Sequence, residues 1–326
     1  MRALHRKLLR ELWGMRGQVL AIALVLAGGV ATLVGSASTL DSLQRTQRTF
    51  YEEYRFAEVF AGLKRAPAHL RERIARLPGV AEAETRVVAG ATLTVPGFAD
   101  PVTARLVSLP DGRQPRLNRL FLRSGRLPRP ESRREAVVSE PFAEAHGLQP
   151  GDALRAVVNG RRMAIRVVGV GLSPEFIYQI RPGDLFPDFK RYAVLWLNRT
   201  PLAAAYDMEG AFNDVAVRLE NGATVDAVSD RLDHLLDPYG GLGAHGRDRQ
   251  VSHRYLAEEM RGIESTVNTV PYLFLGVAAF LLNIVLTRLI HHQRELIGIL
   301  KAFGLSNAAV ARHYLSMVGI IVALGG

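Results

Sequence analysis

Residues Arg288–Tyr314 read RLIHHQRELIGILKAFGLSNAAVARHY, a short basic segment between two apolar runs, Val270–Leu286 and Tyr314–Leu324. Four apolar side chains in this segment recur at the spacing of one helix face: Leu296, Ile297, Leu300 and Phe303. The charged side chains fall elsewhere on the helical wheel. A basic amphipathic segment between apolar runs is typical of a loop at a membrane surface, so we expect the chain to be organised around membrane helices.

A glycine divides this segment. Gly304 is well suited to end the first helix, because glycine adopts the left-handed conformation common after helix ends. Ser306 or Asn307 can then cap a second short helix, Ala308–His313. The segment therefore predicts a helix, a glycine break and a second helix, lying against a membrane face.

The run QRELIGILKAFGLSN, residues 293–307, resembles the cytoplasmic connection after the second membrane helix of FtsX/MacB-type ABC transporter permeases. The resemblance implies that this loop contacts a partner ATPase. The residues that it assigns to this coupling role are Arg294, Glu295, Gly298, Lys301, Gly304, Ser306 and Asn307. An ordinary basic juxtamembrane helix is the alternative.

Composition narrows the class of protein. The chain has 326 residues, no cysteine and a formal net charge of +10. Many of its arginines flank apolar runs, which favours an anionic lipid surface over nucleic acid. There is no zinc-finger spacing, RNA-binding aromatic motif or basic recognition helix, so no nucleic-acid partner is expected.

The N-terminus reads as a basic helix followed by a membrane span. Residues 1–18 carry one acid, Glu11, against five bases, and form an amphipathic helix expected at the cytoplasmic surface. Residues 19–40 have no charge and are long enough to cross a hydrocarbon core of ~30 Å as the first transmembrane helix. A cleaved signal peptide is the alternative, but no clean Ala-x-Ala site ends the run.

Small residues form a ladder on the first span that would let another helix approach closely. The residues predicted to pack against other helices are Ala23, Ala27, Ala31 and Gly35, with Asn283 hydrogen-bonding from the second span, residues 270–287.

Residues 41–269 read as a large extracytoplasmic α+β domain with helical stalks at both ends. The predicted fold class is thus an α-helical membrane protein with this domain inserted between the first and second transmembrane helices. Within the domain we expect a first unit with a strand, a helix and a β-rich stretch, at Phe56–Leu63, Pro67–Leu77 and Val80–Val95.

A second unit should follow, with strands at Val102–Leu109 and Glu135–Ser139 and a hairpin turning at Asn159-Gly160. Its order GRLP, EAVVSE, GLQPGD and RVVGV is similar to the extracytoplasmic domain of the same permease family. A strand–helix–strand–helix pattern from Tyr192 to Leu236 predicts a return to the first unit. We expect an irregular loop at Ile177–Lys190 and a mobile stretch at Pro238–Gly246.

The last apolar run, Leu315–Leu324, has only ten residues, whereas a span needs ~20. We interpret residues 288–313 as the cytoplasmic coupling segment and 314–326 as the start of a third, truncated transmembrane helix, so that the chain is the N-terminal part of a longer protein. A short re-entrant C-terminus is the alternative.

Two common catalytic motifs are missing from the sequence. There is no Walker-type phosphate loop and no Gly-x-Ser-x-Gly elbow. The adjacent His291 and His292 point apart on a helix and cannot share one metal ion. We therefore expect a non-catalytic subunit without cofactor or metal, with ATP hydrolysis on a partner chain.

The resulting hypothesis is a permease of the bacterial cytoplasmic (inner) membrane, multi-pass, acting with an ABC ATPase as a dimer or pseudo-dimer of permease halves. The resemblance implies export or extraction of a lipid, lipoprotein or hydrophobic compound, driven by motion transmitted to the outer domain. Two alternatives stay open: a two-span membrane sensor, and a permease-like regulator of cell-wall hydrolases that transports nothing.

Overall fold

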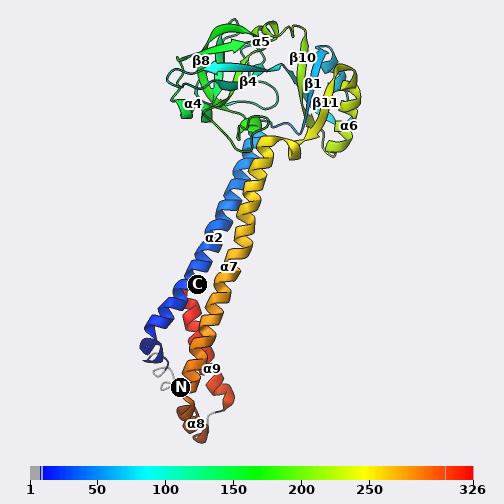
Figure 1. Ribbon diagram of the computed structural model, residues 1–326. Helices are drawn as coiled ribbons and strands as arrows, with labels where there is room; N and C mark the ends of the chain where they lie inside the picture. The colour runs from blue at the N-terminus through cyan, green and yellow to red at the C-terminus, as the bar shows by residue number, and fades with distance from the viewer. Residues whose placement is uncertain (1–7, 9, 305, 326) are drawn as a thin grey trace. The chain divides into compact units, whose positions relative to one another are not determined.

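The computed structural model describes residues 8, 10–304 and 306–325, apart from the side chain of Leu300. The chain divides into two compact units (Figure 1). The α+β unit is Thr46–Glu258, and the helical unit is Met1–Arg45 with Glu259–Gly326.

Helices make up the helical unit. They are a short helical stretch at residues 10–14, α2 (Arg16–Glu53), α7 (Val251–His292), α8 (Arg294–Ala302) and α9 (Asn307–Gly325), of which α2 and α7 continue into the α+β unit. Three helices are long and apolar enough to cross a membrane: α2, α7 and α9. The expected second short helix does not end at His313. It runs on as α9 for 19 residues, because nothing in its sequence breaks the helix between the capped start and the apolar run.

Close contacts join the helices of this unit. Its core contains Ile22 and Leu26 of α2, Ala278 of α7, and Met317 and Ile321 of α9. Such a core forms because each helix turns one apolar stripe toward the others. The helices of this unit therefore pack around one shared hydrophobic core within a single chain.

The first lobe of the α+β unit is a four-stranded antiparallel sheet in the order β11-β1-β10-β2. Its elements are β1 (Val59–Pro67), α3 (Leu70–Ala75), β2 (Val80–Arg86), β10 (Ala211–Leu219), α6 (Val225–Leu236) and β11 (Gly241–Gly246). Apolar side chains of α3 and α6 share one core with the strands, so both helices cover the same face of the sheet (Figure 1).

The second lobe is a seven-stranded sheet in the order β5-β8-β6-β9-β4-β3-β7, and an additional pairing of β7 with β8 closes six of its strands into a ring. Its elements are β3 (Val88–Thr94), β4 (Val102–Leu109), β5 (Phe121–Gly125), β6 (Glu135–Ser139), α4 (Glu140–His146), β7 (Ala153–Val158), β8 (Arg161–Leu172), β9 (Tyr192–Asn198) and α5 (Arg199–Ala205). Three single 3-10 turns complete the described unit: η1 (Pro174–Phe176), η2 (Asp237–Tyr239) and η3 (Arg247–Arg249).

Several sequence expectations are confirmed. Asn159 and Gly160 both have positive φ, 45° and 75°, as the predicted two-residue hairpin requires. The second lobe is inserted in the first, because β10 pairs with both β1 and β2. The chain returns to the first lobe one strand later than expected. The expected first strand of the return, β9, pairs instead with β4 and β6 of the second lobe.

Other local expectations were wrong. The predicted helix Pro67–Leu77 is only α3, and Pro67 ends β1 instead. The Val80–Val95 stretch is β-rich as expected, but its two strands, β2 and β3, lie in different sheets and not in one unit. The glycine-rich Pro238–Gly246 is not a mobile stretch, because it contains β11, which pairs with β1 at the edge of the first sheet. Backbone pairing there outweighs the low strand propensity of glycine.

Arg86 joins the two lobes through buried ion pairs. Its Nη2 donates to Oε1 of Glu175 in the second lobe at 3.0 Å and lies 2.6 Å from Oδ1 of Asp214 in the first. The Arg86 and Glu175 side chains are only 6% and 7% exposed. Burial opposes ionisation of Glu175, but the charge and hydrogen bonds of Arg86 lower its pKa below the ordinary value for glutamate. Both lobes are thus tied to one buried guanidinium.

Candidate coupling segment

The chain turns twice between α7 and α9. Gln293 leaves helical geometry, with φ −100° and ψ 13°, so that α7 and α8 are separate helices. Gly304 follows α8 with φ +88°. A Cβ placed on Gly304 would meet no atom within 4 Å, so glycine is favoured by the backbone conformation and not by lack of space.

Ser306 caps the start of α9. The backbone N–H of Ala309 donates to Ser306 Oγ at 3.2 Å, and the N–H of Val310 donates to the Ser306 carbonyl oxygen at 3.2 Å. Asn307 is the first residue of α9 and is exposed. Of the two capping candidates, the structure therefore selects Ser306.

α8 turns most of its surface outward. All seven residues expected to contact the partner are exposed: Arg294, Glu295, Gly298, Lys301, Gly304, Ser306 and Asn307. Large apolar side chains are also exposed, most of all Phe303 at 80% and Ile299 at 54%. Ile297 packs against the core of the helical unit. An exposed apolar surface bordered by charge is typical of a protein interaction site.

A polar network that the sequence did not reveal connects both ends of this segment to the N-terminal helical stretch. Gln293 Nε2 donates to Glu11 Oε1 at 2.8 Å, and His313 Nε2 lies 3.1 Å from Glu11 Oε2. The Tyr314 hydroxyl donates to Gln293 Oε1 at 3.0 Å. The Glu11 and His313 side chains are 11% and 8% exposed. The N-terminal helical stretch is thereby bound to both sides of α8.

The one available signal for this network was the isolation of Glu11. It is the single acid among the first 18 residues and lies on an otherwise basic helix. Its partners are about 300 positions away in the sequence, so no spacing rule connects them. Only the tertiary structure brings Glu11 to Gln293 and His313.

The residues predicted to pack between helices differ in how far they are buried. Ala23 is buried, and its carbonyl oxygen lies 2.6 Å from where a Cβ on Gly325 of α9 would be. Ala27 is half-buried, whereas Ala31 and Gly35 are exposed and border a shallow cavity. Asn283 is exposed, and its side chain makes no hydrogen bond with the part of the chain that the structure describes. Contacts to another chain stay a prediction for the exposed members.

Comparison with known proteins gives two family matches. A family model described as MacB-like periplasmic core domain matches residues 19–235, and one described as FtsX-like permease C-terminal matches residues 268–326. A comparison with curated protein sequences gives no match.

Two solved structures are similar to the chain. The extracellular domain of the ABC-type transporter YknZ from Gram-positive bacteria has 13% identity and a TM-score of 0.36, with 57% of this chain and 97% of that chain covered. The periplasmic region of MacB from Actinobacillus actinomycetemcomitans has 11% identity and a TM-score of 0.37, with 63% of this chain and 92% of that chain covered.

Proposed function

Because this chain belongs to the MacB/FtsX type of ABC transporter permease, we propose that it transmits the ATP-driven motion of a separate ATPase to its extracytoplasmic α+β unit. In this arrangement α8 and its flanking turns are the cytoplasmic surface that binds the ATPase. The observation that carries the proposal is the outward-facing apolar and charged surface of α8, set between Gln293 and the left-handed Gly304.

Force applied to α8 has two routes into the helical unit. Through Gln293 it reaches α7, a continuous helix from Val251 to His292. Through Gln293 and His313 it reaches Glu11 and the N-terminal helical stretch. Helices are stiff along their axes, so these contacts support transmission by displacement. Binding of the ATPase needs to favour one conformation by only a few kcal/mol to change its population strongly.

The proposed topology places residues 1–18 and 288–313 in the cytoplasm of a bacterium and the α+β unit outside the inner membrane. We further propose that the transported or extracted molecule is a lipid, lipoprotein or hydrophobic compound, and that permease halves pair in the membrane. The match of residues 268–326 to the permease C-terminal model argues against the two-span sensor, which would carry a soluble signalling domain there.

Substitutions in α8 and its C-terminal turn test the proposal. Gly304→Val forces a β-branched residue into a left-handed conformation, at a cost of about 1–2 kcal/mol, and Glu295→Lys adds positive charge to a basic surface. We expect both to reduce recovery of the permease–ATPase complex and coupled ATP hydrolysis, Gly304→Val by roughly 5- to 30-fold. The measurement uses the permease purified with its ATPase in lipid nanodiscs.

Gly319→Ala is the matched control. Gly319 lies in α9, outside the seven coupling residues, it has no positive φ, and a Cβ there would meet no atom within 4 Å, so alanine should be accepted or favour the helix. If Gly304→Val and Glu295→Lys both retain normal complex formation and coupled hydrolysis, α8 is not the transmission point.

A further inference from the structure

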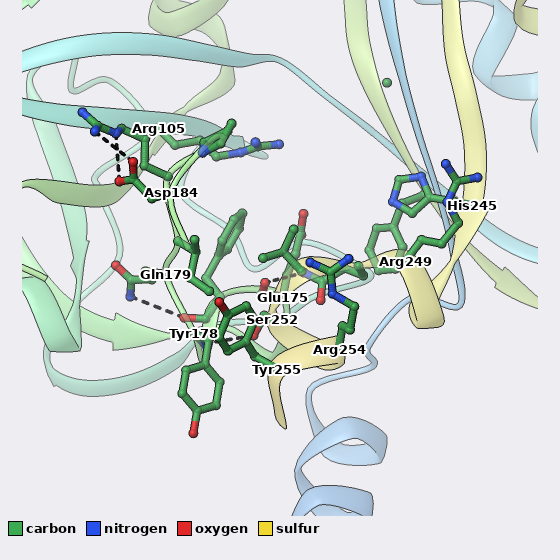
Figure 2. A pocket seen from close by; sticks show the side chains of 18 of the residues that line it. Arg105, Glu175, Tyr178, Gln179, Asp184, His245, Arg249, Ser252, Arg254 and Tyr255 are labelled. Atoms are coloured by element: carbon green, nitrogen blue, oxygen red, sulfur yellow. Dashed lines mark hydrogen bonds and ion pairs between the residues drawn. The ribbon is translucent and has the colours of Figure 1, made fainter. Parts of the chain in front are cut away.

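A cavity of about 590 Å³ lies between the two lobes of the α+β unit (Figure 2). β1 and β11 of the first lobe line one side, and the second lobe lines the other with β4, β9 and the loop after η1. The first residues of α7 complete it. This volume falls within the range of roughly 300–1,000 Å³ that is typical of small-molecule sites.

Hydrogen bonds hold the wall of this cavity in place. Gln250 Nε2 donates to the Glu175 carbonyl oxygen at 2.6 Å, and Tyr178 N–H donates to Ser252 Oγ at 2.9 Å. The Tyr255 hydroxyl donates to the Leu185 carbonyl oxygen. η1 and the loop after it are thereby joined to Gln250 and the start of α7 by three hydrogen bonds. A site fixed in this way loses little entropy when it binds a ligand.

Arginines outnumber the acids at the cavity wall. Glu175 and Asp214 share the buried Arg86, Asp214 also lies 3.9 Å from Arg105 Nη2, and Asp184 binds Arg181 at 3.0 Å. Because Arg249 and Arg254 also line the cavity, the net charge of its wall is positive and favours an anion.

Two guanidinium groups in the wall have N–H donors available to an anion. Arg249 is exposed and makes no ion pair with any residue that the structure describes. Arg105 forms an ion pair with Asp214 through Nη2 at 3.9 Å, but its buried Nε has no hydrogen-bond partner in the described chain. Figure 2 labels Arg105, Arg249 and Arg254 among the side chains that surround the same cavity. A charged head group between Arg105 and Arg249 would receive charge-assisted hydrogen bonds.

Aromatic and apolar side chains form the remaining wall. The Tyr178 and Tyr255 rings lie 6.0 Å apart, and Phe176 stacks under the Arg105 guanidinium at 5.7 Å. Leu185 and Leu242, both lining the cavity, are 76% and 74% exposed. Such large apolar side chains are left in water unless a ligand or partner covers them.

We infer that this cavity binds an anionic amphiphile, with its phosphate or carboxylate head group on Arg105 and Arg249 and its apolar part on the tyrosine rings and the exposed leucines. This inference rests on the proposed transport function, for which it names a substrate class. It is independent of the coupling segment, because every residue involved lies in the α+β unit.

The test measures saturable binding of radiolabelled octyl phosphate to the full chain in lipid nanodiscs, with empty nanodiscs as background. Neither ATPase nor nucleotide is present, so failure here is separate from failure of the coupling proposal. We expect the double variant Arg105→Gln/Arg249→Gln to bind at least tenfold more weakly. Arg249→Gln alone should also weaken binding, and it breaks no ion pair in the described chain that could affect folding.

The matched control is Arg73→Gln/Arg76→Gln, which removes the same charge from exposed positions on and after α3. Its affinity should be unchanged. Octyl glucoside has the same chain without the charge and should not compete, while inorganic phosphate should compete only weakly. Absence of saturable binding, an equal loss in both double variants, or displacement by octyl glucoside would each overturn the inference.

Discussion

Arg86 is the residue on which the two lobes of the α+β unit depend. Removing its guanidinium leaves the buried Glu175 without its hydrogen-bonded positive partner and leaves the half-buried Asp214 with the more distant Arg105, at 3.9 Å. Arg86→Met should therefore lower the free energy of unfolding by about 3–5 kcal/mol. Thermal unfolding of the detergent-purified chain checks this. Arg76→Met, which breaks an exposed pair with Glu72, should change stability little; equal melting of both variants would contradict the central role of Arg86.

In the helical unit, the single residue Glu11 holds the coupling segment through its contacts with Gln293 and His313. Glu11→Ala removes both the hydrogen bond from Gln293 and the contact with His313. We therefore expect α8 to unfold locally or to detach from the helical unit more often. Hydrogen bonds to charged groups contribute about 1.5–3 kcal/mol, so we expect tryptic cleavage at Arg294 and Lys301 to become roughly tenfold or more faster.

Glu264→Ala serves as the comparison for Glu11, because Glu264 is an exposed acid on α7 whose side chain contacts no polar partner in the described chain. Its cleavage rate should match that of the natural protein. If Glu11→Ala is cleaved no faster than Glu264→Ala, the network does not hold the coupling segment.

At the scale of elements, close packing between α2 and α7 occurs at glycines that the small-residue ladder does not include. A Cβ on Gly29 would lie 2.8 Å from Cβ of Phe274, and one on Gly28 would lie 3.4 Å from its ring. Side-chain-free positions let the helices approach at this point. The ladder itself begins at the buried Ala23 and ends at the exposed Ala31 and Gly35.

Two substitutions separate packing within the chain from packing between chains. Gly29→Leu should destabilise the purified monomer, because the new side chain meets α7. Ala31→Leu should leave the monomer intact but weaken assembly of permease halves if the exposed ladder is an interface. Thermal unfolding and crosslinking in membranes report the two effects. Val34→Leu, at an exposed position on α2, is the control; if it reduces crosslinking as much as Ala31→Leu, the ladder has no special role.

For the whole molecule, the decisive property is which side of the membrane the α+β unit and the coupling segment occupy. The chain has no cysteine, so single cysteines report one position each. Arg133→Cys lies in the α+β unit and His292→Cys at the end of α7, and both residues are exposed. In spheroplasts an impermeant maleimide should label Arg133→Cys and should reach His292→Cys only after lysis. Labelling of both before lysis would reject the proposed topology.

Much of this organisation could be predicted because its determinants are local. Charge-free apolar runs, basic flanks and the glycine after α8 each act within a few residues, so they indicate membrane helices and the turn at Gly304 directly. Strands such as β4 and β6 and the Asn159-Gly160 turn follow from short patterns in the same way. The family match and the membrane-capable helices confirm the predicted fold class.

Tertiary structure alone decided the features that depend on distant partners. The sequence does not reveal that Arg86 meets Glu175, that Glu11 meets His313, or that Gly241–Gly246 becomes an edge strand beside β1. Each depends on groups far apart in the chain whose charges or backbone donors must be satisfied once they are withdrawn from water. The cavity between the lobes arises from the same cause: its wall is assembled from segments that become neighbours only when the second lobe is inserted into the first.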